Sequence, residues 1–220
     1  MNQTNLNNIA ETLAQISLEI GSIKFSPDQP FTWASGHKMP LYNDNRLLLG
    51  NSEHRSLIAK GFQDLINHYA PNAEVIAGTA TAGIPHATTL ADILQLPLIY
   101  VRSAPKSHGM GNQIEGPLRP NQKVLVIEDL VSTGGSAAKA VTAIREAGGI
   151  VKNCFSIFSY GFNEASERFK SISCEIHSIL KFSQLLEVAQ STQNLPESDV
   201  EVLLSWQKNP FKWAENKGLV

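Results

Sequence analysis

Two segments near the start of the chain place apolar residues three or four positions apart, which predicts amphipathic helices. The first segment spans the first twenty residues and is followed by Gly21, a typical helix stop. Its apolar positions are Leu6, Ile9, Leu13, Ile16 and Ile20. The second segment has an apolar stripe made of Leu57, Ile58, Phe62, Leu65, Ile66 and Tyr69. Residues 31–49, between the two, are irregular or strand-like.

From residue 73 onward, short β-branched runs alternate with helical periods. The runs that predict strands cover residues 73–77, 98–102, 124–127, 150–160 and 175–180. The periods that predict helices cover residues 84–94, 136–147 and 164–170, and further helices are expected in the tail. This alternation predicts an α/β fold with a doubly wound parallel sheet, covered by helices on both faces. Ligands of such sheets bind beyond the carboxyl ends of the strands, where loops 78–83, 103–117 and 128–136 fall.

Composition narrows the possible partners. The chain has 220 residues and a net charge of −2, which argues against a broad nucleic-acid interface. Its apolar runs are too short to span a bilayer, and the first residues lack the pattern of a signal peptide. Cys154 and Cys174 lie among strand-like residues without a Cys-x-x-Cys motif. We therefore expect two buried free thiols and a location in the cytoplasm, without a membrane or nucleic-acid partner.

The most informative stretch is residues 124–138. A buried strand leads to two carboxylates, Glu128 and Asp129, and then to the small-residue turn 132–136, which opens a helix. Unpaired backbone N–H groups at a helix start suit a phosphate. The carboxylates suit hydroxyl groups or a cation, so the stretch indicates a phosphorylated sugar. Neither the P-loop pattern nor the dinucleotide fingerprint is present.

This stretch resembles the PRPP-binding motif of the type I phosphoribosyltransferases, without gaps. In that family the acidic pair holds the ribose hydroxyls of PRPP and the turn holds its 5′-phosphate. The resemblance implies that the PRPP-binding residues are Arg102, Lys106, His108, Glu128, Asp129, Leu130, Val131, Ser132, Thr133, Gly134, Gly135 and Ser136. Asp129 is implied as a catalytic residue, and Thr79, Ala80, Thr81 and Ala82 as the pyrophosphate loop.

The long polar loop after residue 102 is rich in glycine and carries three potential cations. Such a loop can close over a pyrophosphate and exclude water. Lys106, His108, Gly109 and Gly111 resemble the catalytic loop of orotate phosphoribosyltransferases. That resemblance implies that Lys106 and His108 are catalytic. It also implies a homodimer in which loop 103–117 completes the neighbour's site.

Residues 31–46 resemble the segment that forms a hood over the base in orotate phosphoribosyltransferases. The chain departs from some members at Ala34, at Thr81-Ala82 and at Ser159 to Phe162, where an arginine for the orotate carboxylate is missing. Ser132, Lys38 and Arg46 are then the expected orotate-binding residues. The implied organisation is an N-terminal helix and hood (1–50), a phosphoribosyltransferase core (51–182) and a helical C-terminal extension (183–220).

The resemblance implies transfer of the phosphoribosyl group from PRPP to orotate in pyrimidine biosynthesis. Mg²⁺ is expected to arrive with PRPP, because no all-protein ligand cluster is visible. Three alternatives keep parts of the pattern. They are a phosphoribosyltransferase for another base, a non-catalytic PRPP-binding regulator and a generic doubly wound nucleotide-binding domain. A phosphoribosyltransferase for another base would not explain residues 31–46. A non-catalytic regulator would not need Lys106 and His108. A generic nucleotide-binding domain would not need Glu128 and Asp129.

Overall fold

The computed structural model describes residues 3–104 and 113–219. Its centre is a six-stranded sheet in the order β10-β9-β8-β5-β6-β7, in which β5, β6, β8, β9 and β10 run parallel. The strands are β5 (Val75–Thr79), β6 (Leu98–Val101), β7 (Ile114–Glu115), β8 (Lys123–Val131), β9 (Ile150–Ser159) and β10 (Glu175–Lys181). The expected parallel sheet is confirmed, with a short antiparallel edge strand, β7, added beside β6.

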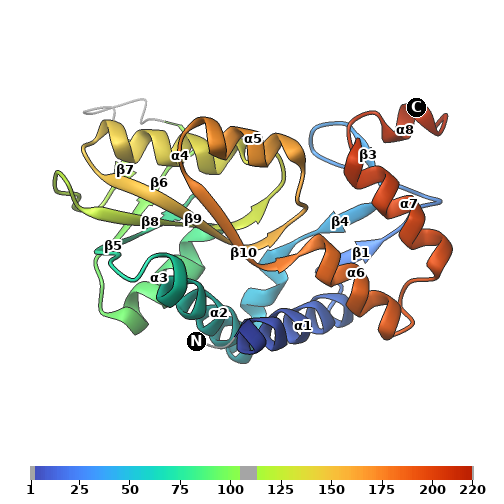
Figure 1. Cartoon of the computed structure of the whole chain (residues 1–220), viewed down its shortest axis with the longest axis horizontal. Coiled ribbons are helices and arrows are strands. Elements are labelled where there is room, and N and C mark those ends of the chain that lie inside the picture. The colour runs from blue at the N-terminus through green and yellow to red at the C-terminus, as the bar shows by residue number, and fades with distance from the viewer. Residues whose placement is uncertain (1–2, 105–112, 220) are drawn as a thin grey trace.

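Helices cover both faces of this sheet (Figure 1). They are α1 (Gln3–Glu19), α2 (Ser52–Tyr69), α3 (Gly83–Leu94), α4 (Gly135–Glu146) and α5 (Asn163–Ser171). Successive residues of the strands pack into two different apolar clusters, one on each face of the sheet. Ile76 and Leu125 pack in the cluster that contains α1, α2 and α3, whereas Val75 and Val126 pack in the one that contains α4. The alternation follows from the two-residue period of a strand.

A small hood precedes the core. Two antiparallel pairs form it, β1 with β4 and β2 with β3. The hood consists of β1 (Ile23–Phe25), β2 (Phe31–Thr32), β3 (Lys38–Met39), β4 (Leu41–Asn43) and the 3₁₀ helix η1 (Asn45–Gly50). The tail forms α6 (Phe182–Ser191), α7 (Glu197–Lys208) and α8 (Trp213–Asn216). Figure 1 shows α7 and α8 beside β3, and α8 contacts that strand.

Three sequence predictions need correction. The strand expected at 124–127 continues to Val131, because β9 stays paired beside it, with Glu128 opposite Ser156 and Leu130 opposite Phe158. Glu128 and Asp129 therefore lie inside a strand rather than after it. The first core strand begins at Val75 instead of residue 73. The long loop expected after residue 102 contains β7, whose two residues are too few to leave a periodic pattern.

Both cysteines are buried and free, as expected from the sequence.

Candidate active site at the carboxyl edge of the sheet

The acidic pair occupies consecutive positions of β8, so the two side chains leave opposite faces of the strand. Glu128 is 5% exposed. Its Oε2 accepts a hydrogen bond from Ser136 Oγ at 3.1 Å, and its Oε1 accepts one from the backbone N–H of Asp129 at 3.0 Å. Burial, reinforced by the hydrogen bond and charge of Asp129, raises the pKa of Glu128 to about 8. Glu128 is therefore largely protonated at neutral pH.

The turn after β8 presents the start of α4. Gly134 takes a left-handed conformation with φ of 72° and no side chain caps the helix. The first backbone N–H groups of α4 are therefore left for an anion. Added bulk at Gly134 would meet Phe169, since a Cβ there would lie 2.8 Å from that ring. Arg168 steadies the turn by donating from Nε to the carbonyl oxygen of Thr133 at 3.0 Å.

The small-residue loop after β5 lies against the same end of β8. Thr79 is buried and donates from Oγ1 to the carbonyl oxygen of Ile127 at 3.1 Å. The loop includes a cis peptide bond between Ala80 and Thr81 and leads to Gly83, the first residue of α3. A Cβ at Gly83 would lie 2.5 Å from the oxygen of Ile127 and 3.4 Å from the Cα of Glu128. Only glycine permits this approach, which brings the loop beside the acidic pair.

A buried hydrogen bond ties the hood to the acidic pair. Asn45, in η1, is 2% exposed and donates from Nδ2 to the carbonyl oxygen of Asp129 at 2.8 Å. The hood is therefore held over the end of β8.

Between the hood and the end of β8 lies a cavity of about 660 Å³. The hood, the β8 turn, the end of β9 and the tail all contribute walls. The lining residues are Thr32, Trp33, Ala34, Ser35, His37, Tyr42, Asn43, Leu130, Ser132, Thr133, Tyr160 and Phe211. Aromatic rings beside hydroxyl and amide groups suit a flat polar ring. Because Ser132 and Thr133 also belong to the turn that leads into α4, the cavity adjoins the candidate phosphate site.

Known proteins are similar to this chain over most of its length. Residues 50–182 match the model of the phosphoribosyl transferase domain. The orotate phosphoribosyltransferase of Listeria monocytogenes is 46% identical over 207 residues, which cover 94% of this chain and 99% of that relative. This chain belongs to the orotate phosphoribosyltransferase family. The resemblance carried by the sequence motifs is thus confirmed.

Solved structures of this family share the fold. The orotate phosphoribosyltransferase of Aeropyrum pernix matches with a TM-score of 0.72 and 26% identity, covering 84% of this chain and 99% of that one. The enzyme from Mycobacterium tuberculosis, solved in complex with PRPP, matches with a TM-score of 0.62 and 25% identity, covering 80% of this chain and 98% of that one.

The expected PRPP-binding residues are placed in different ways. Leu130, Ser132 and Thr133 line the cavity, whereas Val131 is buried in the core. Arg102 lies at the neck of the long loop, where its backbone N–H donates to the oxygen of Gln113 at 2.9 Å. Its Nη1 lies 3.5 Å from Oε1 of Glu115, so the guanidinium has an acidic partner.

Of the three expected orotate-binding residues, Ser132 lines the cavity, whereas Lys38 and Arg46 do not. Arg46 instead forms a bidentate pair with Asp44, with Nε–Oδ1 and Nη2–Oδ2 distances of 2.6 and 2.9 Å. This pair lowers the pKa of the Asp44 carboxyl. Lys38 lies in β3, opposite Thr32, next to the cavity residue His37. Lys106 and His108 lie outside the described residues.

Several site residues were missed from the sequence. They are Asn45, Tyr160, Arg168 and Phe211, which come from four separate segments. Asn45 lies in the hood segment 31–46 and Tyr160 in the segment 159–162, but no local pattern singles either out, and Arg168 and Phe211 belong to no motif. His86, on the first turn of α3, is also buried, and burial lowers its pKa to about 4, so its ring is neutral at pH 7. Only the aromatic residues between 31 and 42 carried a sequence signal, as part of the hood segment.

Among residues 3–104 and 113–219, no three potential ligands of the His, Cys, Asp and Glu types gather as a metal site. Asp129, which is partly exposed, offers the carboxylate oxygen that suits a hard cation. None of the helices within those two ranges is long and apolar enough to cross a membrane.

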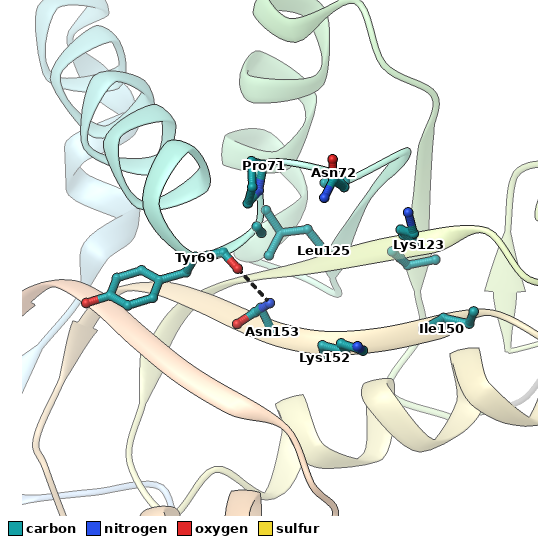
Figure 2. A pocket seen from close by; sticks show the side chains of 11 residues that line it. Tyr69, Pro71, Asn72, Lys123, Leu125, Ile150, Lys152 and Asn153 are labelled. Atoms are coloured by element: carbon teal, nitrogen blue, oxygen red, sulfur yellow. Dashed lines mark hydrogen bonds between the residues drawn. The ribbon is translucent and has the colours of Figure 1, made fainter. Parts of the chain in front are cut away.

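A second hollow, of about 370 Å³, lies at the opposite end of the sheet, where β5, β8 and β9 begin (Figure 2). Its polar groups include Lys123, Lys152 and Asn153, and Asn153 donates from Nδ2 to the oxygen of Tyr69 at 3.2 Å. Its lining includes no carboxylate and no helix start. This hollow lacks the groups that would hold ribose hydroxyls and a phosphate together, so the active site is assigned to the carboxyl edge.

Proposed function

We propose that this protein transfers the 5-phosphoribosyl group from PRPP to orotate, giving orotidine 5′-monophosphate and pyrophosphate in pyrimidine biosynthesis. The observation that carries the proposal is that the candidate ribose-phosphate site lies directly beside the cavity for the base. The acidic pair and the uncapped start of α4 adjoin a cavity that has the size and walls for a flat base. Together they fit a ribose phosphate on one side and its acceptor on the other.

The proposed reaction is a displacement at the anomeric carbon. A bond forms from the ring nitrogen of orotate, the bond to pyrophosphate breaks, and pyrophosphate leaves with the electron pair. The transition state has oxocarbenium character, as in glycoside cleavage, so carboxyl groups near the ribose favour it. Asp129 and Glu128 hold the ribose hydroxyls, and the turn 132–136 holds the 5′-phosphate. No side-chain nucleophile is required, because the base itself attacks.

The leaving group needs positive charge and hydrogen-bond donors. The loop 79–82 offers backbone N–H groups beside the acidic pair, and Lys106, His108 and Arg102 add cations. Mg²⁺, when bound, would neutralise negative charge on pyrophosphate. The carboxylate of Asp129 would offer the cation a suitable oxygen ligand. The proposal includes a cytoplasmic location, which the two free buried thiols support.

Loss of orotate absorbance, measured together with pyrophosphate release, tests the function. Purified protein with PRPP and Mg²⁺ should consume orotate and release pyrophosphate in equal amounts, and chelation of the cation should stop both. Pyrophosphate release that does not depend on orotate would overturn the proposal. Binding of PRPP without turnover would favour the regulator instead.

The proposal also includes a homodimer in which loop 103–117 acts on the neighbouring site. A mixture of Lys106→Ala and Asp129→Asn proteins tests this arrangement. If the loop acts across the dimer, subunit exchange creates one site with both residues intact, and activity rises above that of either variant. Activity that stays at the sum of the two variants contradicts a shared site.

A further inference from the structure

The C-terminal tail reaches the base cavity. The phosphoribosyl transferase domain ends at residue 182, yet Phe211, which follows α7, lines the cavity together with hood residues. The tail, like the hood, therefore supplies part of the cavity wall from outside the matched residues. Phe211 is partly buried, while its neighbours Pro210 and Trp213 are buried.

Trp206, at the end of α7, anchors the tail behind the cavity. It is fully buried and donates from Nε1 to Sδ of Met39 in β3 at 3.1 Å. Its ring lies 6.3 Å from Trp33 and 5.6 Å from Tyr160, both edge-on. Trp33 and Tyr160 line the cavity, so Trp206 supports two of its walls from behind.

Phe211 joins the hood to the end of β9 from the other side. Its ring lies 5.2 Å from His37, in an edge-to-face arrangement, and 6.1 Å from Phe162. His37 closes the turn between β2 and β3, where its carbonyl oxygen accepts a hydrogen bond from Trp33 N–H at 2.9 Å. The turn from Trp33 to His37 is therefore packed against Phe211, and both line the cavity.

We infer that Phe211 is a positioning residue for the acceptor base. It fixes the Trp33–His37 turn over the base cavity through its ring contact with His37, and its other ring contact is with Phe162. Neither partner belongs to the acidic pair or to the start of α4. This inference rests on the proposed function, since the base is taken to be orotate. Loss of the ring should weaken base binding and leave PRPP binding intact.

The test is Phe211→Ala, with KM measured separately for orotate and PRPP. An edge-to-face aromatic contact contributes about 0.5–1.5 kcal/mol, so KM for orotate should rise about 2- to 10-fold. KM for PRPP and kcat should stay close to wild type. Phe211→Tyr keeps the ring and should restore the orotate KM. Leu204→Ala, on the exposed face of α7, is the matched control and should change neither KM.

Hydrogen exchange separates this inference from the proposed function. Amide hydrogens of residues 31–39 should exchange faster in Phe211→Ala than in wild type or Leu204→Ala, whatever base the protein uses. Equal exchange together with unchanged KM values would overturn the inference and leave the function standing. An equal rise of the KM values for orotate and PRPP would assign Phe211 a general structural role, and this result would also overturn the inference. Inactivity of wild type with orotate would contradict the function, while the exchange result would still decide the role of Phe211.

Discussion

The two halves of the active site are built in different ways. The phosphoribosyl half uses two short, contiguous segments, 79–83 and 128–136, at the ends of neighbouring parallel strands. Its proposed chemistry depends on backbone N–H groups and two adjacent carboxyl groups. The base half is assembled from the hood, the end of β8, Tyr160 and the tail residue Phe211. A half-site built from backbone groups and residues adjacent in sequence is visible as a compact sequence motif. A half-site built from side chains that are far apart in sequence is not.

The largest expected effect concerns the leaving group, which belongs to the phosphoribosyl half. Lys106→Ala should lower kcat about 100-fold, because one well-placed donor in such a site contributes about 3 kcal/mol. Steady-state rates at saturating PRPP and orotate measure this. Lys60→Ala, on the exposed side of α2, is the control and should behave as wild type. A loss of only a few-fold would remove the loop from the chemistry.

A backbone test of the same half is Gly83→Ala. The new Cβ would lie 2.5 Å from both the oxygen of Ile127 and Oγ1 of Thr79, so loop and strand must separate. Overpacking of this kind should lower the free energy of unfolding by about 1–3 kcal/mol. Denaturant unfolding measures it. Gly50→Ala, where no atom lies within 4 Å of the new Cβ, is the control and should change little. Equal stability of the two variants would show that the loop at Gly83 and strand β8 do not pack as closely as the structure indicates.

Asp129→Asn keeps the shape of the side chain and removes its charge. Since a carboxylate favours the cationic ribose and suits Mg²⁺, kcat/KM for PRPP should fall about tenfold or more. KM for orotate should change less, because the base half is untouched. Asp92→Asn, exposed on α3, controls for net charge. An unchanged kcat/KM for PRPP would indicate that the acidic pair has only a structural role.

The smallest expected effect on turnover at neutral pH comes from Glu128→Gln, because Glu128 is already largely protonated there. The clearer readout is stability against pH. The pKa of Glu128 is raised from 4.5 to about 8, so the folded protein binds a proton that the unfolded chain has lost. Wild type should therefore lose stability relative to Glu128→Gln as the pH rises from about 5 to 8. Unfolding curves that stay parallel across this range would contradict the buried, protonated state.

The same contrast explains what the sequence could predict. The alternating strands and helices, the acidic pair and the turn to α4 are local patterns, and each was placed to within a few residues. The end of β8 was misplaced because pairing with β9 is a tertiary interaction. Lys38 and Arg46 were chosen for their charge, but Arg46 pairs with Asp44, two residues away. Phe211 contacts His37 from the far end of the chain, so no sequence window holds that contact.

The choice of base is the central claim, and one panel of reactions tests it most directly. Pyrophosphate release should be measured with PRPP and Mg²⁺ in separate reactions with orotate, uracil, adenine and hypoxanthine. The account predicts release with orotate alone, at a rate that saturates with orotate concentration. Release with another base and none with orotate would keep the phosphoribosyl half and contradict the assignment of the base half.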